Sequence, residues 1–207
     1  MIKIAIIGYG YWGKNLFRNF ISNEKCEVVS VADTDALKLN QLKQNYPSVK
    51  THESFIDILK VEEIDAVVIA TPSSTHFKLS KLALDHNKHV LVEKPMTTSF
   101  SEAKELLEIA RQRDKIILVD HTFLYTPAVQ KIKQIISENK IGNLNFFDST
   151  RINLGIFQSD VNVLWDLAAH DISILNYLVP EKPVSVQAIG ISHTQNDIEN
   201  IAYLSIR

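Results

Sequence analysis

The segment Trp165 to Asp171 contains side chains that can move a proton. Asp166 and His170 are four residues apart, so on a helix they would share one face and could reach a common ligand. A histidine beside a carboxylate, close to a bound alcohol, can act as a general base. The same spacing also fits an ion pair on a helix surface, which from position alone is the commoner outcome.

A second group of residues near the amino terminus could hold a phosphate. Gly8, Gly10 and Gly13 follow an apolar run and open a segment of helical periodicity that begins with Tyr11 and Trp12. The first glycine would allow a tight turn, the second the close approach of a pyrophosphate, and the third close packing of helix on strand. The pyrophosphate would then lie on the amide groups at the start of the helix.

An acidic side chain completes this pattern. Asp33 lies 20 residues after Gly13, at the end of the second expected strand, where a carboxylate can bind both hydroxyls of a ribose. A carboxylate there repels a 2′-phosphate, so we expect NAD as the cofactor and NADP as the less favoured one. The alternative interpretation is a simple glycine turn followed by a solvated aspartate.

Two polar loops follow later strands. They contribute the cofactor-binding candidates Thr71, Pro72, Ser73 and His76 after one strand, and Glu93 and Lys94 after the next. Ligands of open α/β folds lie at the carboxyl ends of the strands, where both loops would be found. A lysine there can contact substrate hydroxyls and a nicotinamide ribose. Either loop could equally be a capped loop with an exposed lysine.

The elements that position these loops can be read from periodicity. Residues 1–120 alternate between short β-branched runs and longer segments of helical period. We expect strands at 2–7, 28–32, 49–51, 66–70, 90–92 and 116–119, and helices at 11–21, 36–46, 53–59, 77–86 and from Ser99 onward. This alternation predicts an α/β fold, a Rossmann-type doubly wound parallel sheet with helices on both faces.

Residues 121–207 have a different pattern, typical of an α+β domain with a mainly antiparallel open sheet. We expect helices at 126–138 and 163–178, and three strands at 143–153, 184–192 and 201–206. The sequence ends at Arg207 directly out of a strand, so we expect this second domain, for substrate and oligomer contacts, to be incomplete. An uncovered apolar sheet face favours self-association, which predicts a homo-oligomer.

Composition limits the function classes. The 207 residues carry a formal net charge of -2, so there is no basic surplus to neutralise a nucleic-acid backbone. No apolar run approaches the roughly 18 residues of a membrane span, and the apolar amino terminus is too short for a signal sequence. Cys26 is the single cysteine, which fits a reducing, cytoplasmic compartment. We expect no metal site.

The glycine motif, the T-P-x-x-x-H loop, E-K-P and D-x-x-x-H-D occur in the order typical of one family. In these motifs the chain resembles the glucose–fructose oxidoreductase and inositol dehydrogenase family (Gfo/Idh/MocA), whose usual chain is considerably longer. The resemblance implies NAD(P) dependence and a sugar or cyclic polyol substrate. It also implies that Lys94, Asp166 and His170 are catalytic, and that the glycines, Asp33 and the 71–76 loop hold the cofactor. Ala168 stands where many relatives have glycine.

The predicted reaction is oxidation of a ring secondary alcohol, or reduction of the matching ketone, in a sugar, nucleotide sugar or polyol. The stretch from Arg151 to Asp166 looks like that of relatives linked to nucleotide sugars, and Arg151 could face a substrate phosphate or carboxylate, or be a solvated strand residue. One alternative is a catalytically impaired NAD-binding protein of the same fold. Another is an enzyme like biliverdin reductase or dihydrodipicolinate reductase, against which the E-K-P and D-x-x-x-H-D motifs argue.

Overall fold

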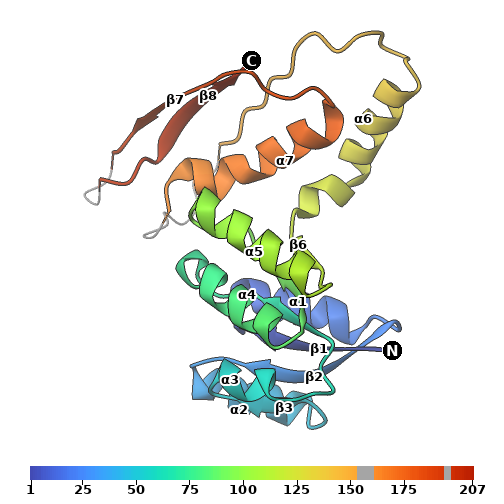
Figure 1. The fold of residues 1–207 in the computed structure, drawn as a ribbon, viewed down its shortest axis with the longest axis vertical. Helices are drawn as coiled ribbons and strands as arrows, with labels where there is room; N and C mark the ends of the chain where they lie inside the picture. Colours follow the sequence, from blue (N-terminus) through green and yellow to red (C-terminus); the bar gives the residue numbers. More distant parts are fainter. Residues whose placement is uncertain (153–160, 194–196) are drawn as a thin grey trace. The chain divides into compact units, whose positions relative to one another are not determined.

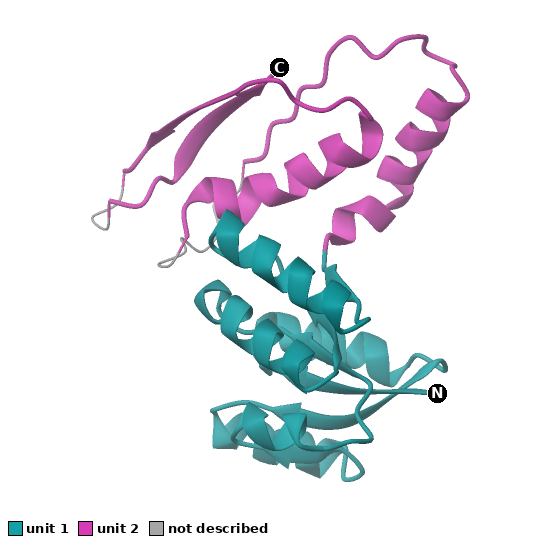
Figure 2. Ribbon diagram, viewed as in Figure 1, with its two compact units in different colours: residues 1–120 teal, residues 121–207 magenta. Residues whose placement is uncertain are grey.

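The chain forms two compact units, Met1–Asp120 and His121–Arg207 (Figure 2). The computed structural model describes residues 1–152, 161–193 and 197–207, and Figure 1 colours them in chain order from blue to red and labels most of their helices and strands. The two units have different architectures and are described separately.

Unit 1 is built on a six-stranded sheet in the order β3-β2-β1-β4-β5-β6, in which every neighbouring pair is parallel. The strands are β1 (Ile2–Ile7), β2 (Cys26–Ala32), β3 (Lys50–His52), β4 (Ala66–Ile69), β5 (His89–Val92) and β6 (Ile117–Val119). Strand order reverses between β1 and β4, which is the switch point at which Rossmann folds bind their ligands. The predicted fold class is confirmed.

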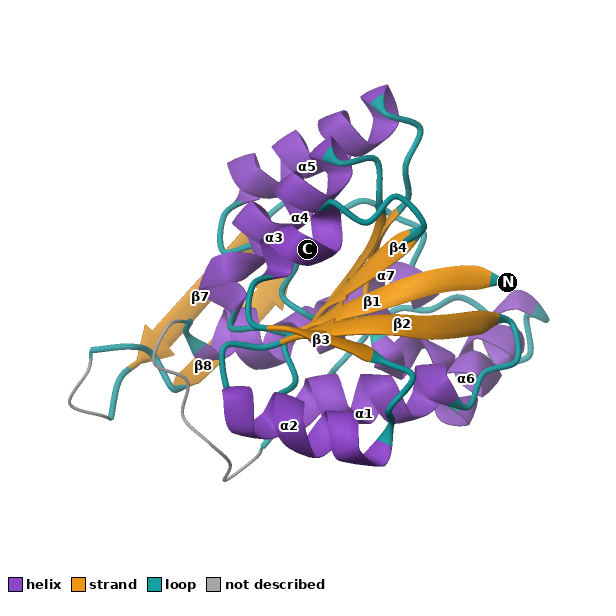
Figure 3. Ribbon diagram, turned by 90° about the horizontal axis from the view of Figure 1, so that it is seen from below, coloured by secondary structure: helices purple, strands orange, loops and turns teal. Residues whose placement is uncertain are grey.

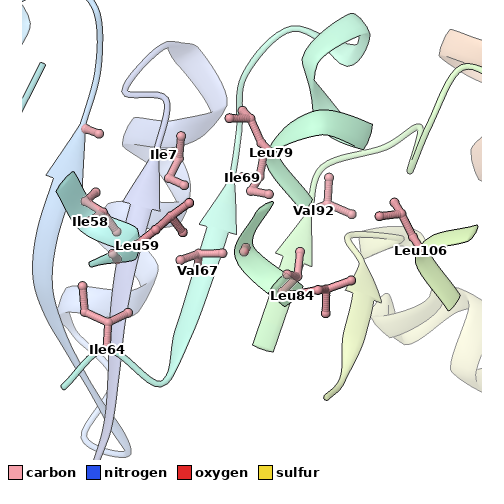
Figure 4. Packing of buried hydrophobic residues seen from close by; sticks show 14 of the residues in the cluster. Ile7, Ile58, Leu59, Ile64, Val67, Ile69, Leu79, Leu84, Val92 and Leu106 are labelled. Atoms are coloured by element: carbon pink, nitrogen blue, oxygen red, sulfur yellow. The ribbon is translucent and has the colours of Figure 1, made fainter. Parts of the chain in front are cut away.

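Helices cover both faces of this sheet (Figure 3). On one face lie α1 (Tyr11–Ile21) and α2 (Ala36–Asn45), and on the other α3 (Phe55–Leu59), α4 (His76–Asp85) and α5 (Phe100–Gln112). The first pair encloses a core around Phe17, Leu39 and Leu42. The second group packs Ile58, Leu84 and Leu106 onto the sheet, and Figure 4 shows this larger core. Burial of such a side chain stabilises the fold by about 1.5–3 kcal/mol.

Side-chain caps fix where two of the helices begin. The carboxylate of Asp35 accepts hydrogen bonds from the backbone N–H groups of Leu37 and Lys38, at 3.0 and 3.3 Å. The hydroxyl of Ser99 accepts one from the N–H of Glu102 at 3.2 Å, as the sequence predicted. Each cap satisfies donors that the helix itself leaves unpaired.

Unit 2 contains α6 (Pro127–Ser137), a π-helical segment η3 (Leu164–Ala168) that continues into α7 (Ala169–Leu178), and an antiparallel pair, β7 (Val186–Ile191) and β8 (Ile201–Ile206). A short 3-10 helix, η2 (Thr122–Tyr125), precedes α6. The side chains of β7 are exposed along its whole length. This unit is therefore α+β with an antiparallel sheet, as predicted.

One part of the prediction for unit 2, the strand at 143–153, was wrong, and the predicted helix at 163–178 contains a feature that the sequence did not indicate. Residues 143–152 form no strand, and residue 153 lies outside the described residues, so the described sheet of this unit has two strands rather than three. A strand-like sequence pairs only when a neighbouring edge is available, and side-chain contacts of 149–151 to α7 hold this segment instead. The predicted helix 163–178 begins with a π-helical turn, a feature often found at functional sites.

Candidate active site

Five loops of unit 1 leave the sheet at the same edge. Because the strands are parallel, the residues that follow β1, β2, β4, β5 and β6 all lie at the carboxyl edge. Four of these residues follow their strands directly, and the fifth, Thr71, comes two positions after the end of β4: Gly8, Asp33, Thr71, Glu93 and Asp120. The topology thus gathers side chains that are far apart in the sequence into one place.

Gly8 and Gly13 are required by the fold itself. Gly8 has φ of +93°, and a Cβ atom there would lie 2.5 Å from the carbonyl oxygen of Ala70. A Cβ atom on Gly13 would overlap the carbonyl oxygen of Gly8. These two glycines let β1 turn sharply and bring α1 close to the sheet.

Gly10 is different, because nothing in the protein requires a glycine there. It precedes α1 with φ of -76°, which any residue can adopt, and no protein atom lies within 4 Å of the position of a Cβ. The N–H groups of the first helical turn have no partner within the helix and face the same end. This position therefore leaves room for a ligand that approaches the backbone closely, such as a pyrophosphate.

Tyr11 and Trp12 open α1 beside this space. Both are exposed, with 77% and 53% of their surface accessible, and their rings pack edge to face with centroids 5.2 Å apart. Their backbone N–H groups belong to the first turn of the helix, so they fit the predicted role through the backbone.

Asp33 is held rigidly at the end of β2. One carboxylate oxygen accepts a hydrogen bond from the N–H of Tyr9 at 2.6 Å, and the other from the N–H of Asp35 at 2.9 Å. A carboxylate oxygen can accept more than one hydrogen bond, so both oxygens retain capacity for ribose hydroxyls. The half-buried carboxylate thus fits the predicted site.

His76 lies inside the protein rather than on the ligand side of its loop. The side chain is 1% exposed, and its ring nitrogens lie 2.8 Å from the carbonyl oxygens of Thr71 and Pro95. Thr71 and Thr75 share a hydrogen bond between their hydroxyls at 2.7 Å, within a loop that also contains the half-buried Ser73 and the exposed Pro72. The histidine therefore fastens the 71–75 loop to the Lys94–Pro95 loop, a supporting role that sequence reasoning did not distinguish from direct contact.

Glu93 forms a carboxyl pair that the sequence interpretation missed. The side chain is 8% exposed, and burial together with the neighbouring Asp120 raises its pKa to about 7, although the N–H and the charge of Lys94 partly oppose the shift. Asp120 follows β6 directly, just as Glu93 follows β5. That shared position at the carboxyl edge is the signal that could have identified it.

The remaining catalytic candidates belong to unit 2. Asp166 lies in η3 and His170 in the first turn of α7, and both are half-buried. Since Lys94 belongs to unit 1, the predicted catalytic trio is divided between the two units. Arg151 is neither a solvated strand residue nor unpaired, because its guanidinium forms an ion pair with Asp171 at 2.7 Å. Among the described residues, no cluster of three potential metal ligands occurs.

Comparison with known proteins matches this site to one family. Residues 2–121 match the model of an oxidoreductase family with an NAD-binding Rossmann fold. The chain belongs to the Gfo/Idh/MocA family. The resemblance seen in the sequence motifs is thereby confirmed, and with it an oxidoreductase family that binds NAD.

Members of the family with known reactions are similar over most of this chain. A UDP-N-acetylglucosamine 3-dehydrogenase of Acidithiobacillus ferrooxidans is 28% identical over 197 residues, which cover 92% of this chain and 58% of the relative. An inositol 2-dehydrogenase of Mycolicibacterium gilvum is 29% identical over 196 residues, which cover 91% and 55%. The chain spans about half the length of the curated relatives it matches.

A solved Gfo/Idh/MocA structure has the same fold. Scyllo-inositol dehydrogenase from Lactobacillus casei, determined with bound NAD(H) and scyllo-inositol, superposes with a TM-score of 0.78 at 21% identity, covering 93% of this chain and 60% of that one. No helix in the described part of the chain is both long and apolar enough to cross a membrane.

Proposed function

We propose that this chain transfers a hydride between NAD and a secondary alcohol or ketone of a sugar, nucleotide sugar or cyclic polyol. The observation that carries the proposal is the space at Gly10, where the fold needs no glycine but a bound pyrophosphate does. Relatives named as a nucleotide-sugar dehydrogenase and as an inositol dehydrogenase support the substrate class.

Asp33 supports NAD as the preferred cofactor. Its carboxylate is fixed by the N–H groups of Tyr9 and Asp35, so it cannot easily turn away from a ligand. Two ribose hydroxyls can donate to it, whereas a 2′-phosphate would place negative charge beside negative charge. We therefore propose that NAD binds more tightly than NADP, a difference that calorimetry with both cofactors would measure.

The nicotinamide ring, when bound, supplies the chemistry of accepting or donating the hydride. In our proposal His170 takes the proton of the substrate hydroxyl, and Lys94 polarises the same oxygen. Asp166 orients this pair or balances its charge. General acid–base groups of this kind typically contribute 10²-fold or more to the rate.

The test is turnover measured by NADH absorbance. UDP- and dTDP-sugars are screened against free polyols, and the best substrate is used with His170→Ala and Lys94→Ala. We expect kcat to fall about 10²-fold or more in each variant. His86→Ala is the matched control, since His86 is an exposed histidine after α4 with no proposed role. A near-normal kcat in either catalytic variant would contradict the role proposed for that residue.

The alternative is a protein that binds NAD without turnover. The exposed apolar side chains of β7 and β8, among them Val186, Ile189 and Tyr203, support it, because an exposed apolar patch marks a surface for contact with another protein. Binding of NAD in calorimetry with no activity on any alcohol would favour this alternative.

The same exposed sheet supports the proposal that the chain self-associates, and the free Cys26 supports the proposal of a reducing, cytoplasmic compartment. Light scattering at micromolar concentration tests the first.

A further inference from the structure

In unit 2, the side chains of Arg151 and Asp171 hold each other in a fixed geometry. The Arg151 guanidinium donates from Nε to one oxygen of Asp171 at 2.7 Å, and from Nη2 to the other at 3.3 Å. The hydroxyl of Ser149 donates to the same carboxylate at 2.6 Å. Burial pushes the pKa of Asp171 upward, but the hydrogen bonds from Arg151 and Ser149, together with the positive charges of Arg151 and His170, outweigh burial and lower the pKa below its usual value. Such a two-pronged contact fixes orientation as well as position.

The same guanidinium contacts an aromatic ring. Its central carbon lies 4.5 Å from the ring centroid of Phe123, which belongs to η2. A cation at this distance over a ring face is attracted to it, and Arg is the residue that most often makes this contact. Arg151 is therefore held from two sides, by a carboxylate and by a ring.

Phe123 in turn contacts the proposed general base. Its ring centroid lies 4.7 Å from that of His170, and the two ring planes are inclined by 64°. His170 and Asp171 are consecutive residues of α7, so the contacts form a closed circuit that leaves the helix at Asp171 and returns to it at His170. The position of the His170 ring is therefore linked to that of Arg151 through their shared contact with Phe123.

We infer that Arg151 and Asp171 are positioning residues that set the orientation of the His170 imidazole through Phe123. The inference rests on the proposed function for its catalytic meaning, since His170 is the proposed base there. In this inference Arg151 supports the proposed active site of the protein and does not bind an anionic group of the substrate. Misplacement of a reacting group by about 1 Å can cost 10²-fold in rate, so a support of this kind affects turnover without touching the substrate.

The direct test is the NMR spectrum of the His170 ring protons in the full chain, assigned by their loss in His170→Gln. The Phe123 ring shifts these resonances while it lies against the imidazole. In Arg151→Met and Asp171→Asn we expect them to move toward the values of a solvent-exposed histidine. Lys133→Met is the matched control, because Lys133 makes a comparable contact with the Tyr177 ring, at 5.2 Å, elsewhere in the same unit.

Turnover gives the second arm of the experiment. We expect kcat to fall about 10- to 100-fold in Arg151→Met, with the KM for NAD unchanged. Arg151→Lys keeps a cation but loses the two-pronged contact, so its kcat should lie between those of the parent and Arg151→Met. Phe123→Tyr keeps the ring and should retain turnover, whereas Phe123→Leu should lose it.

Several results would overturn the inference or the proposed function. Unchanged His170 resonances in folded Arg151→Met, an equal shift in Lys133→Met, or a normal kcat despite shifted resonances would each overturn the inference. If Arg151→Met does not fold by circular dichroism, Asp171→Asn and Phe123→Leu decide it. A parent chain without turnover counts against the proposed function, and the NMR spectra then decide the positioning role alone.

Discussion

Strands β4 in unit 1 and β7 in unit 2 have similar apolar residues but opposite surroundings. In β4, Val67, Val68 and Ile69 are at most 2% exposed, whereas in β7 Ile189 and Ile191 are 58% and 50% exposed. The difference arises from the helices that cover both faces of the parallel sheet. An apolar strand is thus buried only where other elements of the chain pack against it.

The same contrast extends over each whole unit. Among the described residues of unit 2, the buried hydrophobic side chains are Val129, Val161 and Leu178, while unit 1 has two extensive cores. We infer that the two cores of unit 1 stabilise the carboxyl edge of its sheet, where the proposed cofactor site lies. Four measurements test this difference between the units, and the one with the largest expected effect comes first.

Hydrogen exchange should show the largest difference. Amides of β1 and β4 should open only by global unfolding, whereas those of β7 and β8 should open locally. For a domain of ordinary stability we expect exchange in the first pair to be slower by about 10⁴-fold or more. Equal protection in β7 would show that this sheet is covered in solution. Repeating the measurement at several protein concentrations would then test whether a second copy provides the cover.

Two glycine variants should separate folding from binding. Gly13→Ala brings a Cβ against the Gly8 carbonyl, so we expect the free energy of unfolding of unit 1 to fall by about 3 kcal/mol or more. Gly10→Ala meets no protein atom, so its stability should stay within about 0.5 kcal/mol of the parent while NAD affinity falls at least tenfold. Urea unfolding and calorimetry measure the two effects. Unchanged NAD binding in Gly10→Ala would contradict the proposed cofactor position.

Glu93 should make the stability of unit 1 depend on pH. Its folded pKa of about 7 lies above the ordinary 4.5, so the folded state holds the proton more tightly and the free energy of unfolding falls as the pH rises from about 4.5 to about 7. The loss amounts to about 3 kcal/mol. Glu93→Gln cannot ionise, so it should be more stable than the parent at pH 8 and similar at pH 4.5. Parallel pH curves for the two proteins would contradict the carboxyl pair.

The smallest effect is expected at a helix cap. Ser99→Ala removes the acceptor for the Glu102 N–H at the start of α5, which should lower the free energy of unfolding of unit 1 by about 1 kcal/mol. Ser99→Asp restores an acceptor and serves as the control. If Ser99→Ala changes the hydrogen-exchange rates of β7 and β8 as much as it changes those of β4, the two units do not unfold independently.

The sequence predicted unit 1 well because its signals are local. Strands buried on both faces give apolar runs such as residues 4–7 of β1, and glycines that the fold requires for steric reasons, such as Gly8 and Gly13, occur at fixed spacing. The carboxyl edge could be predicted from the same alternation. The residues of the glycine loop and Asp33 therefore lie together as the motif requires.

What the sequence did not predict depends on contacts between distant residues. The pairing of Arg151 with Asp171 leaves no periodic pattern, and the pairing of Glu93 with Asp120 is indicated only by the position of both residues directly after neighbouring strands. The buried position of His76 is of the same kind, because it depends on the carbonyl of Pro95. The expected strand at 143–153 failed because its neighbours in the sheet could not be known in advance.

The two tryptophans of the chain fall one in each unit, Trp12 at the start of α1 and Trp165 in η3. Replacing either with phenylalanine leaves a single intrinsic fluorophore whose emission reports one half of the molecule. Because reduced nicotinamide absorbs where tryptophan emits, energy transfer from the partly exposed Trp12 indole would reveal docking of the coenzyme without any added label. In the variant that keeps Trp165, the emission of this indole would report whether the second unit responds to binding of the coenzyme.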